Sequence, residues 1–242
     1  MRYIGKFFKW LLIGVGGIVG CIVAMVVLLL VLSQLLLTRT PEWNYIKGSD
    51  KTVVLMEYKG DAETLAIPEE LEGLPVTRIG VTHLIAQENS TLREVTIPQN
   101  ITKVYGDLFY NCRALENIYV AEGHPAFVSI DGMLGTIDGR TMLCFPNART
   151  SCVVPADTEI LVWGFGIRSS VTTVVLPEGL KKIESYVFYE CENLAEVAVP
   201  ASVTTIEAGA FKECPKLTLV VTSGSEAERY AAETGIPYRL AE

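Results

Sequence analysis

The feature that most constrains this chain is an internal repeat near its C-terminus. The stretch "FYECENLAEVAVP" begins at Phe188, and "FKECPKLTLVVTS" begins 23 residues later at Phe211. Phe, Cys and Leu recur at matching positions, while the residues between them differ. A unit this short cannot bury its own apolar face, but stacked copies bury it against one another. The pattern predicts a repeat solenoid whose recurring residues form the interior.

The same frame extends upstream in five copies by our count. Each unit reads L-x-x-V-x-V/I-P, with an Ile six residues after the proline and a Phe five residues later. The segment before the proline alternates as a strand does, and proline ends it because it cannot donate a ladder hydrogen bond. Further recurring positions are Leu92, Val95, Ile97, Pro98, Val104, Phe109, Cys112, Leu115, Ile118 and Val120, a degenerate copy at 155–176, and a first copy at 65–80 with an insertion before Ile79.

A second feature is an uncharged apolar run of 27 residues at 11–37. It exceeds the roughly 20 residues that cross a bilayer as a helix. It is also too long for a signal-peptide core, and no small-x-small cleavage site follows it. A soluble core helix rarely stays apolar on every face for so long. The run therefore predicts one transmembrane helix, an uncleaved signal anchor.

Charge predicts the orientation of this anchor. Arg2, Lys6 and Lys9 precede the run without an acid, so residues 1–10 are expected in the cytoplasm and the C-terminal domain outside the cell. The chain after residue 40 holds 16 basic against 28 acidic residues. Such a surface argues against nucleic acid and against lying flat on anionic lipid. Gly16 and Gly20 are spaced for weak homodimerisation of two anchors, although glycine is frequent in membrane helices anyway.

The repeat resembles a known family. The stretch "LKKIESYVFYECENLAEVAVPASVTTIEAGAFKECPKLTLVV" is similar to the leucine-rich repeats of the BspA-like (Treponema pallidum-type) class. The resemblance implies a β-rich right-handed coil over 61–222, with an inserted β-hairpin at about 121–150. It also implies a C-terminal cap at 223–242 that carries a short helix, and residues 38–60 would be a linker and capping strands. Family members are commonly bacterial surface or secreted proteins, several implicated in adhesion, and the family has no catalytic motif.

The cysteines do not form a complete disulfide framework. Cys21 lies in the apolar run and five others follow it, an odd number. Cys112, Cys191 and Cys214 share one repeat position, which predicts buried free thiols. A disulfide between the last two is allowed by a strand spacing of roughly 5 Å. For Cys144 and Cys152, a bridge across a turn and two free thiols stay equally open.

No residue pattern predicts catalysis, a metal site or a cofactor. His83 and His124 have no partner at metal or triad spacing, and no catalytic or phosphate-binding motif is present. His124 is expected to shape a turn before Pro125. The two Asp-Gly pairs, Asp131-Gly132 and Asp138-Gly139, favour tight turns over a calcium loop, because the alternating acids of such a loop are missing.

A binding surface is expected where strand residues point away from the interior. Alternate residues of each strand face outward, and stacked strands would place them on one continuous face. Tyr119 is the favoured anchor, since aromatic residues contribute disproportionately to interfaces. An acidic stripe of Glu94, Glu116 and Glu196 would indicate a basic partner or a cation. The predicted binding residues are Arg93, Glu94, Thr96, Glu116, Asn117, Tyr119, Thr172, Thr173 and Glu196; Val175, Ala195, Ala198, Thr218, Leu219 and Val221 complete the outward set.

These observations predict a non-catalytic, single-pass membrane protein that displays a leucine-rich-repeat solenoid at the bacterial cell surface. Its function would be recognition of, or adhesion to, an unknown protein or glycan through the strand face. A structural scaffold or spacer in a membrane-associated envelope complex is the alternative, since exposed aromatic residues are few. An enzyme is the third possibility, because a solenoid with two isolated histidines offers no convergent titratable groups.

Overall fold

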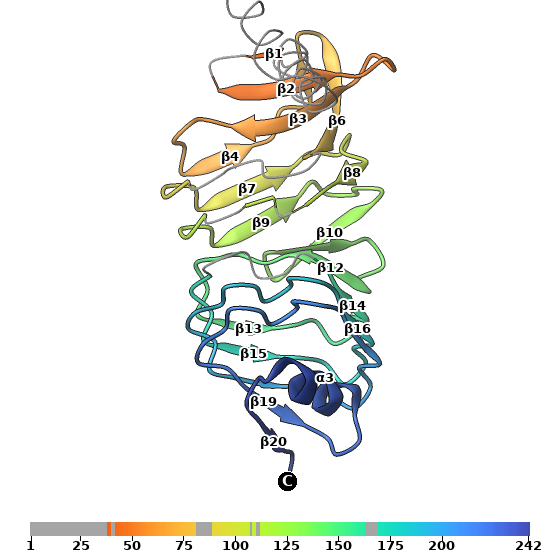
Figure 1. Ribbon diagram of the computed structural model, residues 1–242. Coiled ribbons are helices and arrows are strands. Elements are labelled where there is room, and N and C mark those ends of the chain that lie inside the picture. Colours follow the sequence, from red (N-terminus) through yellow and green to blue (C-terminus); the bar gives the residue numbers. More distant parts are fainter. Residues whose placement is uncertain (1–37, 40–41, 81–88, 107, 110–111, 163–168) are drawn as a thin grey trace, which may run out of the picture.

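The computed structural model describes residues 38–39, 42–80, 89–106, 108–109, 112–162 and 169–242. These residues form a β-solenoid whose coils stack along one axis, with the first strands at one end and a helix near the other (Figure 1). The predicted cytoplasmic segment, the anchor at 11–37 and the pair Gly16 and Gly20 lie outside the described residues. Within the described part, no helix is long and apolar enough to cross a membrane.

The strands form four sheets. The first sheet caps the N-terminal end and contains β1 (Thr38–Arg39), β2 (Trp43–Lys47), β3 (Val53–Tyr58), β5 (Glu70–Leu71), β6 (Leu74–Ile79) and β8 (Lys103–Val104). Two sheets line one side of the coil: β4 (Thr64–Ala66), β7 (Glu94–Ile97) and β9 (Asn117–Val120), then β13 (Ser151–Val153), β15 (Thr173–Val175), β17 (Glu196–Ala198), β19 (Thr218–Val221) and β20 (Tyr238–Leu240). The opposite sheet contains β10 (Phe127–Ile130), β11 (Met133–Thr136), β12 (Thr141–Cys144), β14 (Ile160–Leu161), β16 (Lys182–Ile183) and β18 (Thr205–Ile206).

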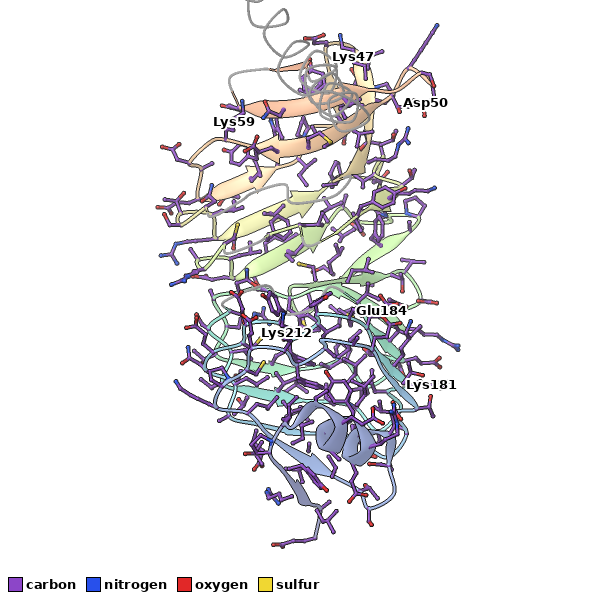
Figure 2. The ribbon with its side chains drawn as sticks, viewed as in Figure 1. Lys47, Asp50, Lys59, Lys181, Glu184 and Lys212 are labelled. Carbon is purple, nitrogen blue, oxygen red and sulfur yellow. The ribbon has the colours of Figure 1, made fainter. Side chains whose placement is uncertain are left out.

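Each C-terminal coil follows the repeat motif. In one coil, β15 ends just before Leu176 and Pro177, the chain turns, and β16 places Ile183 in the opposite sheet. A corner with Phe188 then leads to β17 in the next coil. β15 and β17 pair in parallel, as do β16 and β18. In Figure 2, Lys181 and Glu184 project on the side of the coil that carries β16.

The recurring apolar positions form the interior, as the repeat predicts. The rings of Phe188 and Phe211 stack with centroids 4.8 Å apart and planes 4° from parallel. Leu194 and Ile183 have no exposed surface. Burial of a side chain of this size contributes about 1.5–3 kcal/mol. Stacking between coils is therefore the main source of stability, because no single coil encloses these groups.

The inserted segment replaces one coil with antiparallel strands. β10 and β11 form a hairpin whose turn contains Asp131 at φ 48° and Gly132 at φ 68°. β11 then pairs antiparallel with β12, and Gly139 in the connecting turn has φ 70°. Both Asp-Gly turns are confirmed. β12 pairs in parallel with β14, so the insertion supplies the first strands of the opposite sheet.

A helix covers the C-terminal end of the interior. α3 (Glu226–Thr234) begins after Ser225, whose side chain accepts the Glu228 amide, and ends at Gly235 with φ 74°. Tyr230 of this helix contacts the ring of Phe211, with centroids 6.1 Å apart. After the helix, β20 adds a further parallel strand to β19, which the repeat pattern did not predict.

The last repeat is one residue shorter before its strand than the motif implies. Glu196 pairs with Thr218 and Ala198 with Val220, an offset of 22 residues. A shift of one residue exchanges the two faces of a strand. Leu219 and Val221 are consequently fully buried, so their predicted outward orientation was wrong. The conserved-looking spacing from Leu194 to Leu217 concealed this deletion.

Candidate functional site

The predicted binding residues fall on two separate surfaces. We call the outward residues of β4, β7 and β9 the N-terminal strand face, and those of β13, β15, β17 and β19 the C-terminal strand face. In the ladders of the described residues, β9 pairs with β7 but not with β13. The free edge of β9 is covered by the hairpin, because the Ile118 amide donates to the Gly132 carbonyl at 2.8 Å and Ser129 Oγ donates to the Ile118 carbonyl at 2.6 Å. The prediction of one continuous sheet face was therefore wrong.

The predicted residues of the N-terminal strand face form pairs with one another. Arg93 forms an ion pair with Glu116 on the next coil. The Tyr119 hydroxyl donates to Glu94 Oε1 at 3.3 Å. Partial desolvation, followed by the nearby Glu94 carboxylate, raises the pKa of Tyr119. Tyr119 remains 42% exposed, but its polar end is already occupied.

A residue from the insertion completes this face. Arg149 Nη2 donates to Asn117 Oδ1 at 3.0 Å, and Arg149 Nε donates to the Glu116 carbonyl at 3.1 Å. Its Nη1 reaches Asp131 Oδ2 at 3.0 Å. A β-carbon on Gly132 would lie 2.6 Å from Arg149 Nη2, so the glycine provides the space for this contact. Arg149 thus joins the hairpin turn to the N-terminal strand face.

The C-terminal strand face carries an aliphatic ladder instead. Val153 pairs with Val175, and Val175 pairs with Ala198, so these three outward side chains lie in one row across adjacent strands. Val153 is 65% exposed and Val175 is 58% exposed. Ala198 is also exposed. Adjacent strands are about 4.8 Å apart, so the row forms a continuous apolar strip.

Polar residues flank the strip on one side. Thr173 pairs with Glu196 in the neighbouring strand, and both are exposed. Arg239 of β20 reaches Glu196, with Nη2 3.0 Å from Oε1. Thr172 lies just before β15, where its hydroxyl donates to the Thr150 carbonyl at 2.9 Å. The remaining predicted residue, Thr96, is half-buried on β7, where it pairs with Tyr119.

The acidic stripe that would have indicated a cation or a basic partner does not form. Glu94 and Glu116 lie on the N-terminal strand face, and Glu196 lies on the other surface. Glu116 and Glu196 each form an ion pair with an arginine. Among the described residues, no group of three or more His, Cys, Asp or Glu side chains is placed to hold a metal ion.

His124 has the structural role that its sequence context predicts. Its Nδ1 accepts the amides of Ala126 and Phe127, each at 3.0 Å, and its ring contacts that of Phe127 at 5.2 Å. The side chain is 3% exposed, and burial lowers its pKa. Because Nδ1 accepts two hydrogen bonds, the neutral form carries its proton on Nε2. The residue fixes the entry to the hairpin.

The cysteines agree only partly with the prediction. Cys152 and Cys191 are buried free thiols, so Cys152 does not bridge to Cys144. Cys214 is a free thiol but is partly exposed, where the repeat position predicts burial. The difference arises because Cys214 belongs to the last coil, and the cap helix covers it less completely than another coil would.

Three residues of the strand faces were missed by reasoning from sequence. Val153 was available in principle, because "SCVVP" ends at Pro155 as the strand motif does and therefore places Val153 outward. Arg149 and Arg239 carried no local signal. Both reach partners distant in sequence, and only the stacking of coils brings them together.

The repeats match one family model. The BspA-type leucine-rich repeat region matches in six copies, at residues 82–128 and 158–229. Our count of five was too low, since degenerate copies keep the inward positions while losing the proline and cysteine that made the others visible. No curated protein matches the chain.

Several solved structures are similar. A leucine-rich repeat protein from Eubacterium ventriosum is 14% identical, with 76% of this chain and 71% of that chain covered and a TM-score of 0.49. A leucine-rich cell surface protein from Faecalibacterium prausnitzii is 22% identical, covering 78% and 55% of the two chains, with a TM-score of 0.45. The pneumococcal vaccine antigen PcpA is 13% identical, covering 76% and 81%, with a TM-score of 0.44. The assignment rests on the repeats themselves: the protein belongs to the BspA-type leucine-rich-repeat family.

Proposed function

We propose that the protein is a non-catalytic recognition module that binds a protein partner through the C-terminal strand face. The observation that carries this proposal is the exposed aliphatic row of Val153, Val175 and Ala198. Covering a valine side chain contributes about 1.5 kcal/mol or more. An aliphatic strip suits a protein surface better than a glycan, because sugar rings stack on aromatic side chains.

A photo-crosslinking residue at position 175 of the full chain, expressed in its own cells, tests this proposal. Position 137 provides a matched control, because Ile137 is a 55% exposed aliphatic residue in the turn between β11 and β12. The expected result is a defined protein adduct at 175 that is absent at 137 and is lost when Val153→Glu is added. Identical patterns at the two positions, or no adduct at 175, would contradict binding at this face.

A structural spacer is the second candidate, and the N-terminal strand face favours it. There the charged residues are paired with one another, so few groups are left to attract a ligand. In the crosslinking experiment this function gives adducts at neither position. A solenoid of this kind then acts only through its length and through its N-terminal attachment.

Display at the cell surface is part of the proposal and is supported by the uncharged run at 11–37 and the basic residues before it. Protease treatment of intact cells carrying a tag at each terminus tests it. Loss of the C-terminal tag with retention of the N-terminal tag is expected. Protection of both tags until the cells are lysed would place the solenoid in the cytoplasm, and recognition of an extracellular partner would then be excluded.

A further inference from the structure

Two thiols from successive coils lie in contact beneath the C-terminal cap. Cys191 and Cys214 occupy the same repeat position, and their side chains share a hydrogen bond. The Cys214 thiol also donates to the Phe188 carbonyl at 2.9 Å. Backbone hydrogen bonds from Phe188 to Ala210 and from Glu190 to Lys212, at 2.8 and 3.0 Å, hold the two corners together. The contact is therefore fixed by the stacking of the coils.

The two sulfur atoms differ in accessibility. Cys191 has no exposed surface, and its Sγ lies 3.7 Å from Ser169 Oγ. Cys214 is partly exposed and lines an open depression of about 490 Å³ between the last coil and α3. Phe211, Tyr230 and Ile236 also line this depression. A small solute can therefore reach Cys214 directly, whereas Cys191 lies behind it.

Their protonation differs in the same direction. The Cys191 thiol, together with the Cys191 amide, donates to the Cys214 sulfur and lowers the pKa of Cys214. The contact with Cys214, and then burial, raise the pKa of Cys191. The thiolate is the nucleophilic form of cysteine, so Cys214 is the more reactive member of the pair. Cys152 provides a contrast, because burial raises its pKa to about 12.

We propose that Cys214 is an oxidation site for small hydroperoxides and that Cys191 is its resolving thiol. The Cys214 thiolate attacks the outer peroxide oxygen; an S–O bond forms, the O–O bond breaks, and the alkoxide leaves and takes a proton. The Cys191 sulfur then attacks the sulfenic sulfur. An S–S bond forms, the S–O bond breaks, and hydroxide leaves as water with the Cys191 proton. Two thiols and one hydroperoxide thus give one disulfide, one alcohol and one water.

The cross-link would join the last two coils at their corner. It closes a loop of one repeat, which restricts the unfolded chain and stabilises the folded one. The inference is independent of what the strand faces bind, since Cys214 lies in the depression beside the cap helix. A dithiol reductant would reverse it.

Peptide mapping of the purified full chain tests the proposal. The reduced protein is treated with hydrogen peroxide, remaining thiols are alkylated, and trypsin is added. Cleavage after Lys182, Lys212 and Lys216 places the two cysteines on different peptides. The expected product joins peptides 183–212 and 213–216 with the loss of two hydrogens, while Cys152 stays alkylatable. Equal loss of alkylation at all three cysteines, or none at Cys214, would overturn the proposal.

Variants separate the two roles. In Cys191→Ser, a dimedone adduct should accumulate on Cys214, because the sulfenic acid has no resolving partner. In Cys214→Ser, Cys191 should remain reduced, whereas its oxidation at the original rate would overturn the assigned order. Cys152→Ser should leave the cross-link unchanged. If a variant does not fold, the oxidised wild-type protein still decides the question, since its Tm should rise and return after dithiothreitol.

Discussion

The two strand faces of the solenoid have the same backbone and opposite surface chemistry. On the N-terminal strand face, Tyr119 contacts Glu94, and Arg93 contacts Glu116. On the C-terminal strand face, Val153 and Val175 project into solvent without a covering group. The comparison teaches that exposure alone does not define a binding surface. A face whose groups already satisfy one another has less to gain from a partner than one with uncovered apolar area.

The insertion is the cause of this difference. It places Arg149 across the end of the N-terminal strand face and covers the edge of β9 with the hairpin turn. The C-terminal strand face begins only after the insertion, at β13, and continues without interruption to β20. One irregular segment therefore divides a periodic surface into two surfaces with different properties.

The sharpest test of inward against outward positions uses one substitution at two sites. Val197→Ala removes two methyl groups from a side chain with no exposed surface, and we expect a loss of about 2 kcal/mol. Val175→Ala, on the outward side of the neighbouring strand, should change stability by less than about 0.5 kcal/mol. Urea unfolding measures both. Equal losses would contradict the assigned alternation of the sheet.

The second test removes the residue that ties the insertion to the N-terminal strand face. Arg149→Met keeps much of the side-chain packing but loses the contacts to Asn117, Glu116 and Asp131, and should cost about 1 kcal/mol. Hydrogen exchange should increase in β9 and β10 and not in β15 to β19. Arg140→Met is a matched control, because Arg140 is more exposed and forms a longer ion pair of 3.6 Å with Glu159. A uniform increase across both halves would contradict a local role.

The third test is a pH effect expected in the N-terminal half. Burial lowers the pKa of His124 in the folded protein below its ordinary value of 6.5. The unfolded chain therefore takes up the proton first, so the contribution of His124 is complete above pH 6.5 and is lost as pH falls toward the folded pKa. Hydrogen exchange near β7 and β10 should rise below pH 6.5 more than near β17.

A non-titrating acceptor provides the control for this effect. In His124→Asn, the side-chain oxygen can still accept a backbone amide two residues later. The pH dependence should then disappear, even if the variant is less stable overall. Persistence of the same pH dependence would assign it to another group.

The smallest expected effect concerns the ion pair of the C-terminal strand face. Arg239 and Glu196 are both about half exposed, so Arg239→Ala should cost no more than about 0.5 kcal/mol. Thermal unfolding at low and high salt should show little difference from the wild type. A loss as large as that of Arg149→Met would show that both faces are held by side-chain pairs, and the comparison would fail.

Sequence alone predicted much of the fold because the repeat imposes a period on burial. The alternation before each proline indicated the strands, and the recurrence of Phe188 at Phe211 indicated the stacked interior. The sequence reading failed where the period itself changed. The 22-residue offset of the last strand exchanged Leu219 and Val221 from outside to inside, and no residue type in that segment announced the change.

The composition and the repeat by themselves determined a BspA-type solenoid, the identity of most interior residues and the two Asp-Gly turns, because these depend on local pattern and on neighbours one repeat away. The tertiary structure decided which surface is open. The contacts of Arg149 with Asn117, of Arg239 with Glu196 and of Cys191 with Cys214 join residues that are 32, 43 and 23 positions apart. Such contacts depend on how coils stack around an insertion and end at a cap, and that geometry is not written in any one segment of the chain.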